Sequence, residues 1–329
     1  MKQTFLWGII AGAALIILPV VFPSRFLINL LTQILIMGLF ATSLNLLVGY
    51  TGMVSFGHAA FFGIGAYTTG IVLQKYSASL ALAFGMTILF SVIAALVIGY
   101  FCIKLGSIYF AMLTLAFNQI IYIIVIRWND MTGGDQGLIG GIPLQPLNLL
   151  GFKILLTNPR AYFIFTVILV VICLIICKLV VDSPFGAILK VIRENADRAY
   201  SLGIRVKSYQ LVVFVLAGIF GGLSGALMSL FISGAYPDFS YWAKSAEPIF
   251  MVIVGGMNSF LGPMIGAGIF TVVIAYATMF TNLWGLIIGG VLVLIILVVR
   301  KGLVDYLMEL TASGAIFNFE RLLKSKEKN

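Results

Sequence analysis

Long apolar runs alternate with short polar connections along almost the whole chain. A helix needs about 20 apolar residues to cross the ~30 Å hydrocarbon core of a bilayer, and most of these runs approach that length. We expect membrane spans near residues 5–22, 27–48, 54–73, 80–103, 107–126, 161–181, 209–233, 247–260, 263–281 and 283–300. The pattern therefore predicts an all-α, polytopic membrane bundle of about ten spans, forming a single transmembrane domain over residues 1–329.

Composition supports a membrane location. Hydrophobic residues make up 61% of the chain and charged residues 9%, whereas an ordinary soluble domain has about 25% charged residues. Ten spans with short connections use most of the 329 residues, so we expect no large soluble domain. The first apolar run could also be a signal peptide, but Pro23-Ser24-Arg25 is a poor cleavage site, which favours an uncleaved span.

Basic residues are distributed unevenly between the two sides of the predicted bundle. If the N-terminus is cytoplasmic, six of the 20 lysines and arginines lie outside, Lys244 among them, which leaves fourteen for the inside. This asymmetry predicts that both termini are cytoplasmic, with a basic tail over residues 302–329. The net charge of +9 is then a topology signal, and because no soluble domain carries it, nucleic acid is not an expected partner.

Two connections between spans are longer than the others. The outer one, residues 127–160, is rich in glycine and is interpreted as a plain connector, with a partner-binding surface as the alternative. The inner one, residues 182–208, begins a helix with Ser183 as N-cap and Pro184 at the first helical position. We expect one amphipathic helix over residues 184–202, stopped by Gly203.

The polar face of this inner helix mixes acids with bases. Glu194 is spaced to form ion pairs with Lys190 and Arg198, four residues away on either side. A helix of this kind either lies on the inner leaflet of the membrane or docks onto a partner protein. The acidic residues favour docking, since a purely lipid-binding face seldom keeps them.

Glycine clusters interrupt two later apolar runs. Gly255-Gly256 and Gly262-Pro263 interrupt these runs, and the first run is only about ten residues long, too short to cross a bilayer, which predicts a broken or re-entrant helix pair. The earlier segment, residues 52–57, loosely resembles residues 256–262. Such breaks are tolerated where the freed backbone groups are buried in protein or face water, so these segments supply a candidate translocation path. Its candidate residues are Gly52, Ser55, Gly57, His58, Gly255, Gly256, Asn258 and Ser259.

His58 is the only histidine of the chain. An ionisable residue within a span is a functional candidate, but a neutral imidazole can also bond to a backbone carbonyl, and we favour that structural role. No acid is expected inside a span, because Asp238 and Glu247 are placed at the outer edge of one. A secondary transporter with an intramembrane carboxylate and a membrane enzyme with clustered acid–base or metal-binding residues are therefore poor alternatives.

Small residues recur at every fourth position after the inner loop. The series consists of Ala217, Gly221, Gly225, Ser229 and Ser233. Such a stripe allows another helix backbone to approach closely. We assign Gly221 and Gly225 to helix packing rather than to contact with a substrate.

Several stretches in a fixed order carry a resemblance to a known family. They are SLNLLVGYTGMVSFGHAAFFGIGAY, TGGDQGLIGGIP, RENADRAYSLGIRVKSYQLVVFVLAGIFGGLSGAL and SAEPIFMVIVGGMNSFLGPMIGA. In these stretches the chain resembles the LivM-type permease subunits of branched-chain amino-acid ABC transporters. The stretches are distributed over most of the chain from residue 43 to residue 267 and onward. The resemblance implies an ABC importer permease whose cargo is branched-chain or related apolar amino acids, with urea or short-chain amides as the alternative.

The resemblance also implies the partners. It implies no catalytic residue, metal or cofactor on this chain, and the sequence has no GxxxxGK[ST] loop to hold a nucleotide. ATP and Mg²⁺ would be bound by two ABC ATPase subunits, alongside a second homologous permease and an extracytoplasmic substrate-binding protein, in the lipid of a prokaryotic cell membrane. The loop 182–208 would match the cytoplasmic coupling loop of the family. Its ATPase-coupling residues would be Arg193, Glu194, Ala196, Asp197, Arg198, Ala199 and Gly203.

Overall fold

The computed structural model describes residues 24–139, 141–143, 147–149, 152–154, 156–280, 285–286, 289–290 and 302–306. The predicted span 5–22, most of the predicted span 283–300 and residues 307–329 of the tail lie outside these described residues. The longer helices are α2 (Arg25–Thr51), α3 (His58–Lys75), α4 (Leu80–Cys102), α5 (Ser107–Arg127), α7 (Pro159–Asp182), α8 (Pro184–Glu194), α10 (Val206–Ile232), α11 (Trp242–Gly255) and α12 (Gly262–Phe280).

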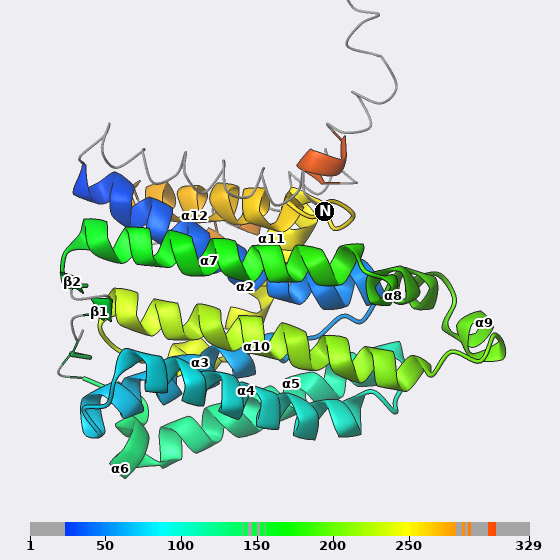
Figure 1. Ribbon diagram of the computed structural model, residues 1–329, viewed down its shortest axis with the longest axis horizontal. Coiled ribbons are helices and arrows are strands. Elements are labelled where there is room, and N and C mark those ends of the chain that lie inside the picture. The colour runs from blue at the N-terminus through cyan, green and yellow to red at the C-terminus, as the bar shows by residue number, and fades with distance from the viewer. Residues whose placement is uncertain are drawn as a thin grey trace, which may run out of the picture.

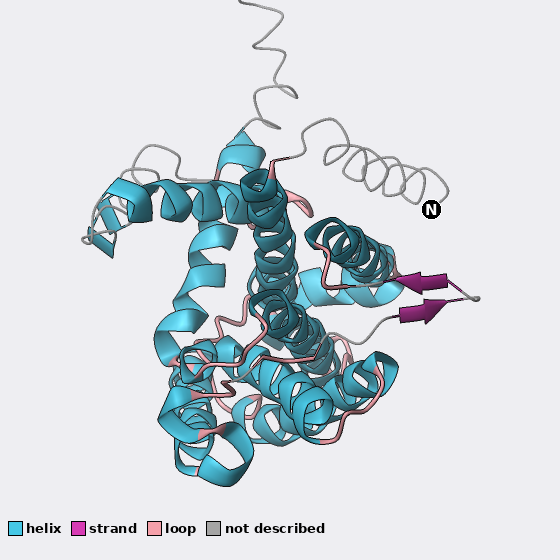
Figure 2. Cartoon of the chain, turned by 90° about the vertical axis from the view of Figure 1, so that its left-hand side faces the viewer, coloured by secondary structure: helices cyan, strands magenta, loops and turns pink. Residues whose placement is uncertain are grey.

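Short elements complete the described chain. They are α6 (Asn129–Thr132), η1 (Gly134–Gln136), β1 (Leu147–Leu149), β2 (Phe152–Ile154), α9 (Ala196–Ser201) and η2 (Pro237–Ser240). The strands β1 and β2 form an antiparallel hairpin within the outer connection, and Figure 2 shows it to one side of the helices. The predicted all-α bundle is confirmed, and this two-stranded hairpin is an addition that the sequence did not indicate.

Among the described residues, six helices are long and apolar enough to cross a membrane, namely α2, α4, α5, α7, α10 and α12. Most predicted spans match a helix to within a few residues, but two do not. The predicted span 54–73 begins only at His58, because the chain leaves α2 through Gly52 in a left-handed conformation and is not helical over residues 52–57. The predicted span 247–260 is also displaced, since α11 begins at Trp242 and ends at Gly255.

Helix α3 is buried for most of its length and packs against α10 through glycine. A Cβ atom on Gly65 would overlap the backbone of Gly222, and one on Gly225 would overlap the carbonyl oxygen of Phe62. The absence of side chains there lets the two backbones approach closely, as in other membrane bundles. The seam is shorter than predicted, because Ser233 caps α10 with a φ of +55° and lies outside the helix.

The inner connection contains two helices, so the prediction of one helix over 184–202 is wrong. Asn195 adopts an extended conformation, with φ −160° and ψ 101°, and its side chain accepts a hydrogen bond from the Arg198 amide at the start of α9. Ser183 caps α8 as predicted, accepting from the Gly186 amide. Figure 1 shows α8 and α9 projecting from the bundle at the end opposite the hairpin.

The predicted ion pairs of Glu194 are also wrong. Among the described residues, the ion pairs are Lys178–Asp182 and Lys244–Glu247. The break at Asn195 interrupts the helical spacing that would have brought Arg198 to Glu194.

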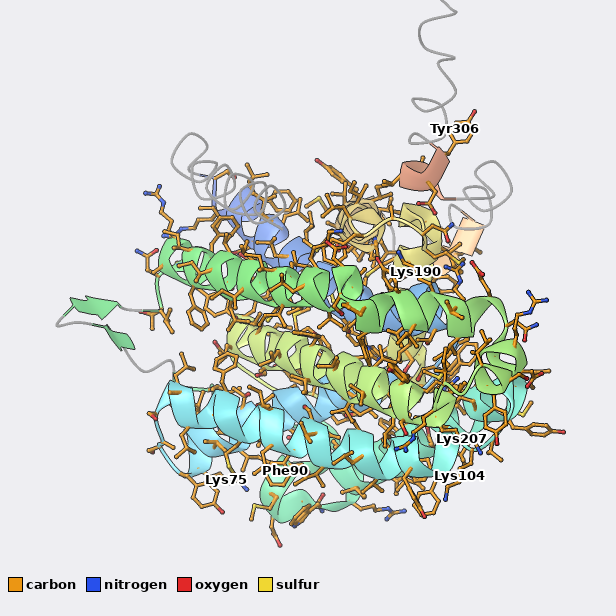
Figure 3. The ribbon with its side chains drawn as sticks, turned by 45° about the vertical axis from the view of Figure 1, so that its right-hand side comes forward. Lys75, Phe90, Lys104, Lys190, Lys207 and Tyr306 are labelled. Carbon is orange, nitrogen blue, oxygen red and sulfur yellow. The ribbon has the colours of Figure 1, made fainter. Side chains whose placement is uncertain are left out.

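Lysines mark the end of the bundle that carries α8. In Figure 3, Lys104, Lys190 and Lys207 lie toward this end, whereas Lys75 lies toward the other. We call the first the α8 end and the second the hairpin end.

Candidate functional site

Arg193, on the last turn of α8, reaches across to two other parts of the bundle. Its guanidinium donates to the carbonyl oxygen of Gly49 near the end of α2. Both terminal nitrogens also donate to the side-chain oxygen of Asn258, each at 3.1 Å, in the turn between α11 and α12. One arginine therefore connects α8 to α2 and to that turn. Hydrogen bonds of this kind, from a charged donor, are stronger than neutral ones.

Asn258 continues this connection to a fourth segment. Its backbone and side-chain amides both donate to the same carboxylate oxygen of Asp305, each at 3.1 Å. The amide of Asn258 thus lies between a cation and an anion, with its oxygen toward Arg193 and its nitrogen toward Asp305. We call Arg193, Asn258 and Asp305 the α8 junction.

Glycine brings the backbone close enough to form the α8 junction. Gly256 has a φ of +112°, and a Cβ atom there would lie 2.8 Å from the carboxyl carbon of Asp305. Gly302, with a φ of +85°, packs directly against the backbone of Gly256. Residues with side chains rarely adopt such φ values, so both positions favour glycine for conformation as well as for space.

The other predicted coupling residues mostly face outward. Glu194, Ala196, Asp197 and Arg198 are exposed, whereas Ala199 is buried, and Gly203 follows α9 with a φ of +84°. Two large side chains beside them are also exposed, Tyr200 at 74% and Leu202 at 72%. The α8–α9 segment therefore presents a surface that is both charged and apolar, which suits contact with another protein better than contact with water alone.

The predicted path residues divide into three groups. Gly52, Gly256 and Asn258 lie at the α8 junction, where the Cγ of Arg193 is 3.5 Å from the position of a Cβ on Gly52. Gly255 and Ser259 belong to the packing of α11 against α12, because both contact Gly262. In the third group, Ser55 lies in the non-helical segment before α3, Gly57 is the N-cap of α3 and His58 is its first residue.

His58 is fully buried at the first turn of α3. Its Nε2 is 2.7 Å from the hydroxyl of Ser43, which itself donates to the carbonyl oxygen of Phe40. Its ring stacks on that of Phe40, with 5.3 Å between centroids. Within the described part of the chain, Nδ1 has no hydrogen-bond partner. These contacts favour the structural role. The imidazole bonds to the Ser43 hydroxyl and stacks on the Phe40 ring, where a bond to a backbone carbonyl was expected.

Sequence reasoning placed Lys244 and Glu247 incorrectly. Lys244 was expected in an outer connection and Glu247 at the outer edge of a span, but both lie within α11. They form an ion pair with 2.7 Å between Nζ and Oε2. The reason is that α11 begins five residues before the predicted span. The opposite charges three residues apart were the available signal, since that spacing places both side chains on one face of a helix.

No metal site is indicated by the described residues, which contain no group of three His, Cys, Asp or Glu side chains able to hold an ion.

Comparison with known proteins gives a consistent result. The family described as "Branched-chain amino acid transport system / permease component" matches residues 26–297. The LivM permease of the high-affinity branched-chain amino acid transport system of Escherichia coli strain K12 is 26% identical over 313 residues, which cover 88% of this chain and 73% of the relative. The corresponding protein of Salmonella typhimurium has the same identity and coverage.

A more distant relative comes from an archaeon. The probable branched-chain amino acid transport permease LivM of Methanocaldococcus jannaschii is 23% identical over 292 residues, covering 75% of this chain and 81% of the relative. No solved structure matches the chain.

Proposed function

This chain belongs to the permease-component family of branched-chain amino acid transport systems, and on that premise we propose that it forms part of the route by which such amino acids enter the cell. The family match over residues 26–297 carries the proposal, because it includes the helices from α2 to α12. The resemblance that the sequence indicated is thereby confirmed, and the chain is a multi-pass membrane protein.

We infer that two ABC ATPase subunits bind ATP and Mg²⁺ and dock on the α8–α9 segment. The exposed Glu194, Asp197 and Arg198, together with Tyr200 and Leu202, support this contact surface. A second homologous permease and an extracytoplasmic binding protein complete the proposed importer. The α8 end then faces the cytoplasm, as do both termini, in agreement with the lysines gathered there.

The α8 junction supplies a physical route for the coupling. Force applied to α8 by the ATPase subunits reaches the end of α2 through Gly49 and the α11–α12 turn through Asn258. Helices joined in this way move together, so a displacement of α8 rocks the bundle between outward-facing and inward-facing states. The chain itself contributes this mechanical connection and the walls of the path, while hydrolysis takes place on the partners.

Uptake of labelled leucine tests the proposed function. Cells express the complete transporter with or without this chain, and excess unlabelled isoleucine or urea is added as competitor. We expect uptake that depends on the chain and is blocked by isoleucine but not by urea. Urea uptake that needs the chain, without leucine uptake, would contradict the proposed cargo and favour the urea or amide alternative.

A further inference from the structure

The first turns of α11 carry two opposite charges that remain partly accessible. The Lys244 ammonium and the Glu247 carboxylate are 2.7 Å apart, and their side chains are 18% and 28% exposed. The ammonium also lies over the ring of Phe62, 5.7 Å from its centroid. The pair is therefore held against the protein on one side and open on the other.

The contacts of this pair place it near the middle of the bundle. Phe62 packs on Phe40, with 4.6 Å between ring centroids, and Phe40 lies within the 27-residue helix α2. At about 1.5 Å rise per residue, Phe40 is about 22 Å from the start of α2 and about 16 Å from its end. The residue next to Lys244 confirms the depth, since the Ser245 hydroxyl accepts from the Ala59 amide in the first turn of α3.

Charges at this depth in a membrane protein are costly. A charged side chain near the bilayer centre costs about 2.5–3.5 kcal/mol on insertion scales and usually marks a water-filled cavity or a substrate route. Lys244 and Glu247 offset each other's charge, but a pair of uncharged residues would serve the packing of α11 without this cost. The open side of the pair therefore points to a ligand with complementary charges.

We propose that Lys244 and Glu247 form a transit site for the charged groups of an α-amino acid, an inference that rests on the proposed function. The α-carboxylate of the cargo binds the Lys244 ammonium, and its α-ammonium binds the Glu247 carboxylate. Each protein charge then exchanges its neighbour for a charge of the cargo, so that no charge is left uncompensated at depth. Since the two charges are three residues apart on the same helix, the exchange requires no movement of the backbone.

This site selects for a zwitterion. An amino acid offers one positive and one negative group on the same carbon atom, which suits two opposite charges separated by less than 3 Å. A neutral molecule such as urea offers no charge to exchange and would leave the pair intact. The site would thus distinguish amino acids from urea or short-chain amides, the two cargo classes that the sequence left open.

The test uses the complete transporter reconstituted in proteoliposomes with its substrate-binding protein. Lys244→Met and Glu247→Gln each keep the approximate shape of the side chain and remove its charge. For both we expect leucine uptake to fall by about tenfold, the effect of losing a hydrogen bond to a charged group. We expect ATP hydrolysis stimulated by the loaded binding protein to stay within about twofold, since α8 and its junction are unchanged.

Lys178→Met is the matched control. Lys178 forms the second ion pair of the described residues, with Asp182, also at 2.7 Å, but that pair lies at the end of α7, beside α8. We expect both uptake and ATP hydrolysis of this variant to equal those of the unmodified chain, because exposed pairs contribute about 0–1 kcal/mol.

A double variant that swaps the two charges is the control for single variants that fail to assemble. Lys244→Glu combined with Glu247→Lys keeps a pair of opposite charges on α11 and reverses its direction. We expect this double variant to assemble in normal yield and still to lose leucine uptake, because the cargo would have to bind with its carboxylate and its ammonium group exchanged. Normal uptake would show that the pair needs only to neutralise itself, and the proposed site would be wrong.

The remaining outcomes also decide between the two proposals. Single variants with normal leucine uptake, or variants that assemble but lose ATP hydrolysis together with uptake, would overturn the transit site and leave the proposed function intact. If the unmodified transporter moves no leucine, the proposed function itself fails, whatever the variants do.

Discussion

The two ends of α11 carry charge in different ways. At its start, Lys244 and Glu247 satisfy each other within one helix, at the middle of the bundle. Beyond its end, Arg193 and Asp305 come from distant segments and meet only through the amide of Asn258. The ion pair within one helix does not join separate segments, so its charges are free to exchange partners. A junction between segments fixes their relative positions, so it transmits force.

The helix between these two ends is held rigidly against α12. A Cβ atom on Gly255 would overlap the carbonyl oxygen of Gly262, and one on Gly266 would overlap that of Met251. Such close contact between two backbones makes α11 and α12 move as one body. Displacement of the α8 junction is therefore expected to reach the pair at the start of α11.

Gly255→Ala disrupts the packing of α11 on α12, because the added methyl group meets backbone atoms that cannot move aside. We expect a loss of about 3 kcal/mol of stability, the upper range for overpacking. Thermal denaturation of the purified chain in detergent measures it. Gly85→Ala on α4 is the matched control, since nothing lies within 4 Å of its Cβ position. Equal stability of the two variants would contradict the close packing of α11 on α12.

Ser245→Ala tests the hydrogen bond that holds the start of α11 against the first turn of α3. The variant leaves the buried amide of Ala59 without its hydrogen bond, which costs about 2 kcal/mol. The same denaturation measurement reports this loss. Ser208→Ala, at an exposed serine, is the control and is expected to change nothing measurable. A variant as stable as this control would show that the hydrogen bond between Ser245 and Ala59 does not hold α11 against α3.

Asn258→Asp tests the α8 junction, which lies just beyond the end of α11. The new carboxylate faces Asp305 at the position where an amide now donates, and we expect leucine transported per ATP hydrolysed to fall about fivefold through altered coupling. The double variant Asn258→Asp with Asp305→Asn restores both the net charge and the donor, now on residue 305. We expect it to recover coupling to within about twofold. Uncoupling that persists in the double variant would contradict the α8 junction.

The apolar pattern predicted most helices of the bundle because burial in a membrane leaves a continuous signal along each span. It misplaced α11, since this helix begins with polar residues around Lys244 that a search for apolar runs excludes. For the same reason, Lys244 and Glu247 were expected at the membrane surface and not within the bundle. A helix that starts within the bundle needs no apolar first turn if its polar side chains find partners, and Ser245 has one in Ala59.

The candidate site was only partly accessible to sequence reasoning. Local signals found Arg193 and the glycine turn containing Asn258 as separate features, because each has a recognisable pattern nearby. Their contact joins residues 65 positions apart in the chain, and Asp305 is a further 47 positions away. No local pattern encodes such pairing. The break of the inner helix at Asn195 was missed for another reason, since an asparagine in a helical pattern does not by itself indicate a cap.

The position of Asp305 has a consequence for how parts of such permeases can be exchanged. The family match ends at residue 297, yet the acid that orients Asn258 follows it at residue 305. A hybrid protein that takes residues 26–297 from this chain and the remainder from a relative would join the turn of one parent to the carboxyl-terminal segment of the other. Grafting boundaries for this protein therefore belong beyond residue 305.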